Sequence, residues 1–156
     1  MIAMTPLFKK LNFKNQAGIL AVNTPESFES ELAAMAGSAT IYKDESDVSA
    51  IDFVIVFVTR QNEIDDSIRK IYPKLEGDAV LWYCYPKGTS KKYKCDFNRD
   101  HGWDELGKFN LEGVRQVAID EDWSALRFRK TVYIKTLTRN FAISEEGKKR
   151  TGKTGA

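Results

Sequence analysis

Residues 53–58 read FVIVFV, an unbroken apolar run rich in β-branched and aromatic side chains. Such a run predicts a strand that is buried on both faces, as in the centre of a parallel sheet. After it the apolar residues follow a helical period, with Ile64, Ile68, Ile71 and Leu75. This stripe predicts an amphipathic helix that Pro73 bends or ends. Residues 79–85, AVLWYCY, then predict a second buried strand after a turn at Gly77-Asp78.

The same alternation of strand and helix signals extends toward the N-terminus. Residues 19–22, ILAV, predict a short buried strand, and Thr24 is expected to cap the next helix with Pro25 in its first turn. Apolar residues at helical spacing support this helix, namely Phe28, Leu32 and Met35. Residues 39–42 predict a second, weaker strand.

The C-terminal third alternates like antiparallel strands. A short helix is expected at 103–108, and residues 114–118 alternate as one strand. A last strand is expected at 123–135, with one apolar face made of Leu126, Phe128, Val132 and Ile134.

We therefore predict an α/β fold, specifically a three-layer sandwich with a mostly parallel, Rossmann-like sheet of order close to 2-1-3-4. An antiparallel pair is expected at the C-terminal edge of this sheet. The single domain is expected to span residues 1–143, followed by a disordered basic tail at 144–156.

Composition restricts the class of protein further. Of the 156 residues, 42% are hydrophobic and 12% aromatic, too many for a disordered chain. No apolar run approaches the roughly 18 residues of a membrane-spanning helix, and the first residues lack the pattern of a signal peptide. We expect a cytoplasmic protein without a membrane partner or a metal site, with Cys84 and Cys95 reduced.

The net charge of +2 hides a segregated distribution. Residues 87–99 hold five basic side chains against one acidic one, a local charge of +4. The tail at 144–156 holds four against two, which leaves the rest of the chain at −4. Concentrated positive charge of this kind favours an anionic partner.

The basic loop is the first candidate site, because ligands bind outside the carboxyl ends of strands in parallel sheets. It offers cations and hydroxyls, namely Lys87, Thr89, Ser90, Lys91, Lys92, Lys94 and Arg99. With Tyr93 and Phe97 interleaved, this set could hold a phosphate, or a nucleic-acid backbone with base stacking. The alternative is a solvated surface loop.

Two nucleotide-binding patterns are incomplete. Residues 147–154, GKKRTGKT, match the phosphate-loop pattern, but only two residues follow, too few for the helix whose amides would receive the phosphates. The predicted strand order also invites comparison with methyltransferases of Rossmann type, with Asp44 placed like a ribose-binding acid. Residues 22–25, VNTP, have no glycine where such enzymes approach the cofactor. We therefore expect a similar fold without a cofactor.

The stretch 120–127, DEDWSALR, is another candidate. It resembles the DWSAxR signature of a bacterial domain family of unknown function, and residues 82–86 resemble that family's tryptophan-containing strand followed by proline. The resemblance implies a fold and a bacterial cytosolic setting rather than an activity. From the residues themselves, Trp123 could anchor the sheet edge, Ser124 could be a nucleophile or polar contact, and Arg127 could clamp an anion. The alternative is a turn before a strand.

Together these features predict a noncatalytic α/β protein that binds an anionic ligand or nucleic acid through residues 87–99 and the tail. Trp123, Ser124 and Arg127 are candidate contributors to the same site. Two alternatives stay open. One is a degenerate or divergent enzyme of methyltransferase-like or nucleotide-binding type. The other is a protein-interaction module with an apolar patch near Tyr133 or the antiparallel edge.

Overall fold

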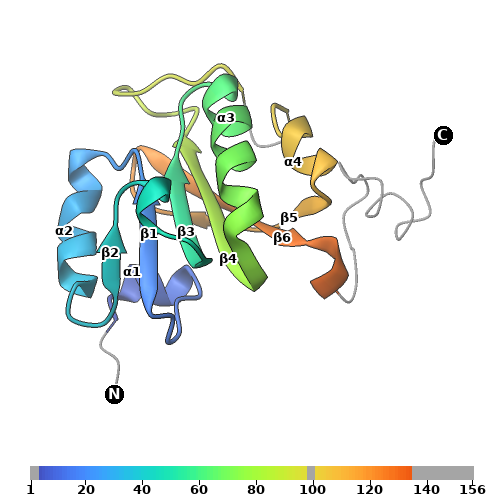
Figure 1. Ribbon diagram of the computed structural model, residues 1–156. Helices are drawn as coiled ribbons and strands as arrows, with labels where there is room; N and C mark the ends of the chain where they lie inside the picture. The colour runs from blue at the N-terminus through green and yellow to red at the C-terminus, as the bar shows by residue number, and fades with distance from the viewer. Residues whose placement is uncertain (1–3, 98–100, 135–156) are drawn as a thin grey trace.

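The computed structural model describes residues 4–97 and 101–134, which contain a six-stranded sheet (Figure 1). The strands are β1 (Gly18–Val22), β2 (Thr40–Tyr42), β3 (Ile51–Phe57), β4 (Leu75–Pro86), β5 (Leu111–Ala118) and β6 (Trp123–Lys130). They lie in the order β2-β1-β3-β4-β6-β5. The first four in this order are parallel, whereas β6 runs antiparallel to both β4 and β5. The predicted fold class is confirmed, including the antiparallel pair at the C-terminal edge.

Helices cover both faces of the sheet and so form three layers (Figure 1). One face carries α1 (Pro6–Lys10) and α2 (Glu26–Met35), and the other carries α3 (Gln61–Ile71) and α4 (Asp104–Lys108). Three short 3-10 helices complete the described chain, namely η1 (Glu45–Asp47), η2 (Tyr72–Lys74) and η3 (Thr131–Tyr133). We refer to the two faces as the α2 face and the α3 face.

The central strand β3 is buried because both faces are covered. Phe53, Ile55 and Phe57 pack on the α2 face, while Val54 and Val56 pack on the α3 face. The predicted helical stripe attaches α3 to the sheet, since its three isoleucines are at most 1% exposed. Full burial of each such side chain contributes about 1.5–3 kcal/mol, so the stripe is the main attachment of this helix.

The predicted cap of α2 is wrong. The helix begins at Glu26, and Pro25 occupies the N-cap position without a side-chain hydrogen bond. The Thr24 hydroxyl instead donates to Glu29 Oε1 at 3.0 Å, one turn into the helix. Pro25 therefore stands one position earlier than predicted, and the Thr24 side chain is free to contact other elements.

The predicted end of the last strand is also wrong, because β6 stops at Lys130. Lys130 pairs with Leu111, the first residue of β5, and the next residue, Thr131, donates its N–H to the carbonyl oxygen of Asn110, which precedes β5, at 3.0 Å. The chain turns into η3 instead, and Val132 is 76% exposed rather than part of an apolar face. Ile134 is buried as expected.

The two cysteines are free, in line with the predicted reduced pair. Cys84 belongs to the core of the α2 face, whereas Cys95 packs against the core of the α3 face, so the sheet separates them. Within residues 4–97 and 101–134 no helix is long and apolar enough to cross a membrane. The predicted tail at 144–156 and its phosphate-loop pattern lie outside the described residues.

Candidate functional site

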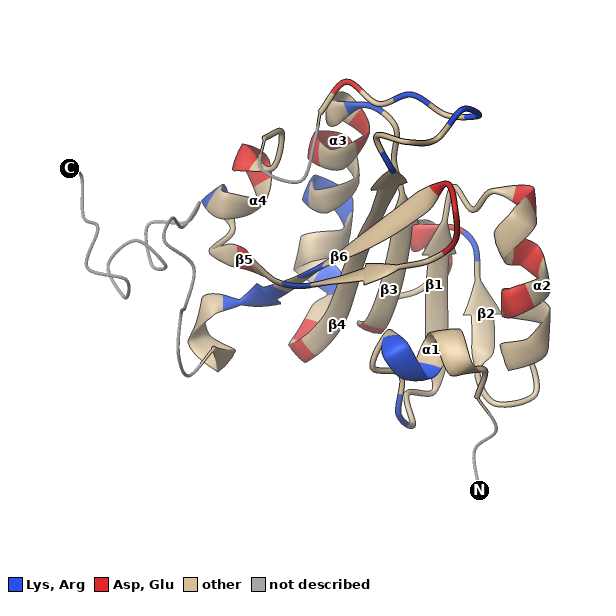
Figure 2. Ribbon diagram, turned by 180° about the vertical axis from the view of Figure 1, so that it is seen from behind, with Lys and Arg blue, Asp and Glu red and all other residues tan. Residues whose placement is uncertain are grey.

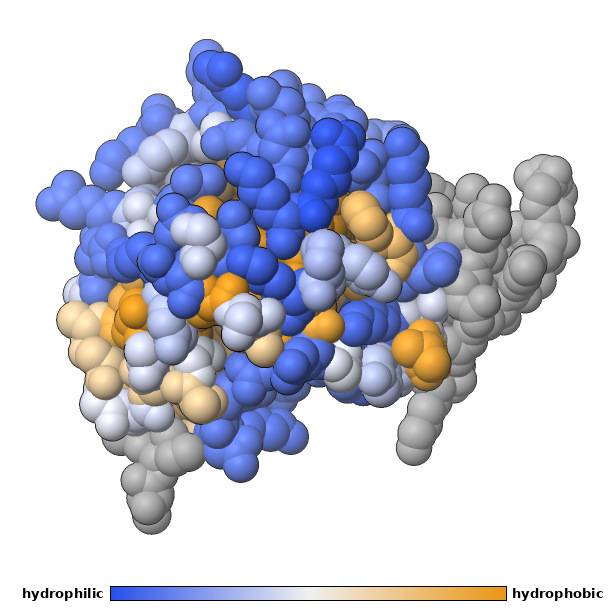
Figure 3. All heavy atoms as spheres, viewed as in Figure 1, coloured by the Kyte–Doolittle hydropathy of each residue, from blue (hydrophilic) through white to orange (hydrophobic). Residues whose placement is uncertain are grey.

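A groove of about 790 Å³ lies at the carboxyl end of β4. One wall is the loop that leaves β4, and the other is formed near the end of β5 and the start of β6. Polar side chains that line this β4 groove include Lys87, Thr89, Ser90, Lys94, Gln116 and Ser124. Basic residues follow one another along the loop (Figure 2), and the end of the molecule that carries it is hydrophilic (Figure 3).

The first half of the loop is held in place by Ser90. Its hydroxyl donates to Asp122 Oδ1 at 2.8 Å and accepts hydrogen bonds from the backbone N–H of Lys92 at 3.2 Å and of Tyr93 at 3.1 Å. The Lys87 N–H also donates to the Asp122 carbonyl oxygen at 2.8 Å. The loop is therefore tied to the turn before β6, and the Ser90 hydroxyl is already engaged in these contacts.

The second half of the loop is tied to the start of α3. Asp96 Oδ1 accepts a hydrogen bond from the Gln61 N–H at 2.8 Å, and the Asp96 N–H donates to the Thr59 carbonyl oxygen at 3.3 Å. A carboxylate at this place satisfies a free N–H group of the helix and complements its dipole. The lysines at 91, 92 and 94 thus lie between two anchored points.

Aromatic rings form the inner layer beneath the loop. Tyr93 packs against Trp123 at 4.8 Å between ring centroids, and Trp123 packs against Phe57 at 5.1 Å. Trp123 is only 3% exposed, so it supports Tyr93 from below rather than lining the groove. On the other side, the Tyr85 hydroxyl accepts a hydrogen bond from Gln116 Nε2 at 3.0 Å.

The structure brings part of the predicted site together. Lys87, Thr89, Ser90, Lys94 and Ser124 all line the β4 groove. Lys91 and Lys92 are exposed on the loop but do not line it, and the Lys92 ammonium lies 5.8 Å from the centroid of the Tyr93 ring. Arg99 lies outside the described residues.

Arg127 does not belong to this group. It is the third residue after Ser124 on β6, and an odd spacing places two side chains on opposite faces of a strand. Leu126 and Phe128 pack on the α3 face, so Arg127 points to the α2 face. The predicted combination of Ser124 and Arg127 in one site is therefore corrected.

Two further lining residues, Tyr85 and Gln116, were not among the predicted site residues. Gln116 reaches the groove because β5 pairs with β6, which places Gln116 opposite Leu126. The alternating pattern at 114–118 indicated a strand, and its register against β6 was needed to bring Gln116 beside Tyr85.

Two side chains that line the groove, Cys95 and Ser124, are candidate nucleophiles. The Cys95 thiol donates to the Phe97 carbonyl oxygen at 2.9 Å, and burial raises the pKa of this thiol above its ordinary value. A protonated thiol is a weak nucleophile. Ser124 is 7% exposed, and the described lining side chains include no histidine or carboxylate to act as its base. Across the described ranges, no three His, Cys, Asp or Glu side chains gather to hold a metal ion.

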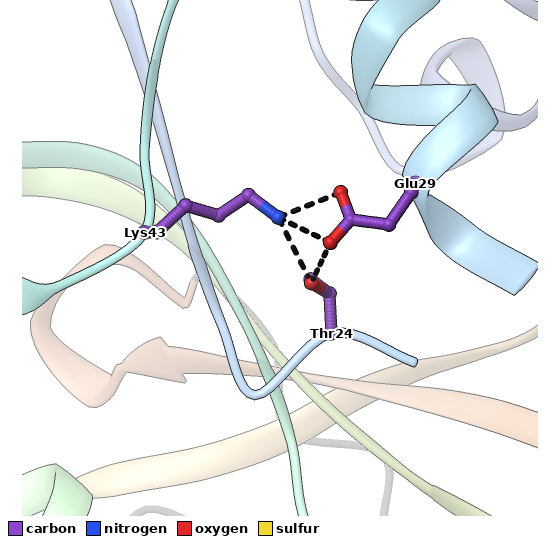
Figure 4. Close-up of polar contacts among 3 residues, drawn as sticks. All are labelled: Thr24, Glu29 and Lys43. Carbon is purple, nitrogen blue, oxygen red and sulfur yellow. Dashed lines mark hydrogen bonds and ion pairs between the residues drawn. The ribbon is translucent and has the colours of Figure 1, made fainter. Parts of the chain in front are cut away.

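A Rossmann-type cofactor crevice would lie at the end of β1, because β2 and β3 flank β1 on its two sides. Here Asn23 follows β1 in a left-handed conformation with φ of 57°, and Pro25 has no N–H group to offer a ligand. Glu29, in the first turn of α2, accepts hydrogen bonds from Lys43 Nζ at 2.7 Å and from the Thr24 hydroxyl (Figure 4). This cluster links α2 to the residue after β2.

The charges of the crevice also differ from those of a phosphate site. The hydrogen bond from Lys43 lowers the pKa of Glu29 below its ordinary value, so this carboxylate stays ionised at neutral pH. Negative charge at the start of α2 uses the helix dipole that would otherwise attract an anion. Asp44 caps η1 and accepts hydrogen bonds from the Ser46 N–H at 3.0 Å and the Ser46 hydroxyl at 2.9 Å. The predicted ribose-binding acid is thus engaged within its own turn.

Comparison with known proteins gives a likeness in structure only. No family model and no curated protein matches the sequence. A SAM-dependent methyltransferase from Aquifex aeolicus is similar with a TM-score of 0.54 and 12% identity, over 80% of this chain and 87% of that chain. The N-methyltransferase NodS from Bradyrhizobium japonicum WM9 is similar with a TM-score of 0.50 and 14% identity, over 80% and 92%. Because the identities are this low, the likeness shows a shared Rossmann-like fold and nothing beyond the fold.

Proposed function

We propose that this chain is a noncatalytic anion-binding protein that uses the Rossmann-like fold found in methyltransferases. Its β4 groove would take a phosphate-bearing ligand. One observation supports the proposal above all: the basic loop that leaves β4 is anchored at both ends and presents Lys87 and Lys94 to a single groove. These are the two charged side chains among the lining residues described.

The anchored loop lowers the cost of binding. Ordering a flexible segment upon binding reduces affinity, and each immobilised long side chain costs about 0.5–1.5 kcal/mol. The backbone from 87 to 96 is already held by Ser90 and Asp96, so a ligand would mainly restrict the lysine side chains. A preformed basic groove with half-exposed Tyr93 suits a nucleotide or a short single strand, because phosphates can meet lysines while a base stacks on the ring.

The arrangement at β1 supports the noncatalytic part of the proposal. A cofactor with the shape of S-adenosylmethionine would meet the side chain of Asn23 and the Thr24–Glu29–Lys43 cluster where glycines normally allow close approach. A smaller pocket of about 350 Å³ does lie at the end of β1, lined by Asn23, Lys43 and Asp44. These bulkier, mutually bonded side chains in place of glycines fit a methyltransferase-like fold that recognises an anion at β4 and does not transfer a methyl group.

A direct binding experiment tests the groove. Fluorescence anisotropy with a labelled oligouridine of about 12 nucleotides measures affinity as a function of salt. We expect the Lys87→Met/Lys94→Met variant to bind about thirtyfold more weakly if each lysine contributes ~1 kcal/mol. Its log–log salt slope should fall by about 1.4, because each phosphate contact to a single strand adds about 0.7.

A matched control removes equal charge elsewhere. Lys9→Met/Lys10→Met changes two exposed lysines on α1, distant from the loop in the sequence, and should bind the oligouridine like the original protein. Equal binding by the original protein and the groove variant would reject the proposal. An equal loss in the control would also reject it, because the effect would then reflect overall charge.

The fold likeness favours one second candidate, a divergent methyltransferase-like enzyme. Binding of S-adenosylmethionine distinguishes the two functions. Calorimetric titration with this cofactor should give no heat of binding if Asn23 and the Thr24–Glu29–Lys43 cluster prevent its close approach to the backbone at the end of β1. Saturable binding that is lost upon substitution near Asn23 would favour the enzyme instead.

A further inference from the structure

A second basic cluster lies on the α2 face of the β5–β6 hairpin, away from the β4 groove. Along β6, Ala125 packs into the core of the α2 face, while Leu126 and Phe128 pack into the core of the α3 face. Arg127 and Arg129 therefore share the side of Ala125. No helix of the described residues lies over this side of β5 and β6, as Figure 2 shows.

Arg127 is half-buried without an acidic partner. Its Nε atom is buried and makes no hydrogen bond, and no ion pair joins Arg127 to a carboxylate of the described residues. Burial lowers the pKa of its guanidinium, and the positive charges of Arg129 and Arg115 act in the same direction. The Asp78 carboxylate raises the pKa of Arg127, but its effect is smaller than that of burial and smaller than that of Arg129.

Asp78 is already bound by another arginine. Arg129 donates to both oxygens of Asp78, with Nε to Oδ1 at 2.8 Å and Nη2 to Oδ2 at 2.6 Å. This bidentate pairing satisfies Arg129. Because Asp78 is bound to Arg129, the other two arginines on the α2 face of the hairpin, Arg127 and Arg115, have no bonded carboxylate among the described residues.

Arg115 and Arg127 are direct partners across the two antiparallel strands. Cβ atoms of such pairs lie about 4.5–5.5 Å apart, and like charges in this position repel. The register shifts between Gly113 and Arg115, and this irregularity is what sets Arg115 opposite Arg127. Bulges of this kind often redirect a side chain at a functional site. Arg115 and Arg127 are therefore opposed cations without a bonded carboxylate among the described residues, and Arg127 is half-buried. A bound anion would reduce the repulsion between the two charges and offset the desolvation of Arg127.

We propose that Arg127 and Arg115 form a second anion site, for a phosphate-type oxyanion, on the α2 face of the hairpin. Guanidinium groups suit this ligand because their N–H groups match phosphate oxygens in pairs. The oxyanion can be free phosphate or a phosphate of a nucleic-acid backbone. The site is independent of the β4 groove, which lies at the carboxyl end of β4 and does not include Arg127.

NMR of the full, 15N-labelled chain tests this site directly. The Nε–Hε signals of the arginines are followed during titration with inorganic phosphate, at constant ionic strength maintained with chloride. We expect a saturable shift of the Arg127 signal and an affinity at least about tenfold weaker in Arg115→Met. Arg127→Lys keeps the charge but loses the paired donors, and it should weaken binding, followed on the Arg115 signal.

The controls separate this proposal from the proposed function. Lys87→Met/Lys94→Met should leave the phosphate response of Arg127 unchanged, even if it abolishes binding in the groove. A second titration uses a short oligouridine that lacks terminal phosphates and identifies the source of the oxyanion. Tighter binding of the oligouridine than of inorganic phosphate, followed on the Arg127 signal, indicates that the site takes a backbone phosphate. No response of Arg127 to either probe would overturn the proposal. An unchanged affinity in both Arg115→Met and Arg127→Lys would overturn it as well.

Discussion

Ser90→Ala should release the first half of the basic loop. The substitution removes the hydrogen bond to the Asp122 carboxylate at 2.8 Å and the two backbone hydrogen bonds from Lys92 and Tyr93. The first is charge-assisted and is worth ~1.5 kcal/mol net, and the neutral pair adds ~0.5 kcal/mol because water can replace the exposed Lys92 contact. The free energy of unfolding should fall by about 2 kcal/mol, which lowers Tm by about 4–8 °C for a chain of this length.

Urea denaturation measures the loss of stability, and amide hydrogen exchange at Lys92 and Tyr93 reports the loop itself. Thr89→Ala is the matched control, because it removes a neighbouring hydroxyl that is exposed and makes no hydrogen bond to the described residues. The variant at Ser90 should also bind oligouridine more weakly than the original protein, which is the reference for binding because Thr89 itself lines the groove. Equal urea midpoints and equal exchange rates in the two variants would refute a tethering role for Ser90.

Three further predictions concern the packing and the titration of residues in the rest of the fold. Ile68→Ala should lower the free energy of unfolding by about 2–5 kcal/mol and Ile68→Val by about 0.5–1.5 kcal/mol, because this side chain is 0% exposed; a urea series measures both. The pKa of Glu29 should be below its ordinary value by NMR titration and rise upon Lys43→Met. Because folding lowers this pKa, the pairing stabilises the fold above the unfolded pKa of about 4.5, and that stability should be lost as pH falls through the folded pKa. Toward a thiol reagent at pH 8, Cys95 should react more slowly than a free cysteine and Cys84 only after unfolding, because burial raises the pKa of both thiols.

The fold was predictable because its signals are local. The apolar run at 53–58 can be buried only by neighbours on both faces, and the change to a helical stripe at Ile64 identifies a strand–helix–strand unit. Repetition of this unit leads to a parallel sheet with helices on both sides. The end of β6 could not be found in this way. Val132 continues the alternation, but the strand stops where β5 has no more residues to pair with it.

The candidate site was predictable in part. The charge count identified the loop at 87–99, and chain connectivity places its described part, 87–97, at the carboxyl end of β4. Gln116 depends on the pairing of β5 with β6, a contact between distant segments that no local pattern reveals. The separation of Ser124 from Arg127 was available in the sequence, because residues three apart on a strand face opposite ways.

The role of individual hydroxyls depended on tertiary contacts. Ser90 and Thr89 look equivalent in the sequence, yet Ser90 bonds to Asp122, which is 32 residues away. Thr24 has the residue type of a helix cap, but its hydroxyl joins Glu29 and Lys43 because Pro25 takes the cap position. Residue type and spacing can suggest a polar contact in such cases, and the fold selects its partner.

Amide chemical-shift mapping with oligouridine tests the central claim most directly, because it reports binding at once at every described residue that has a backbone N–H. The β4 groove predicts the largest shifts in residues 87–97 and at Gln116 and Ser124, with the amides of 23–29 and 43–46 unchanged. Addition of S-adenosylmethionine should shift neither group. Shifts confined to 23–29 and 43–46 with either compound, or a silent loop at saturating oligouridine, would contradict an anion-binding groove at the end of β4.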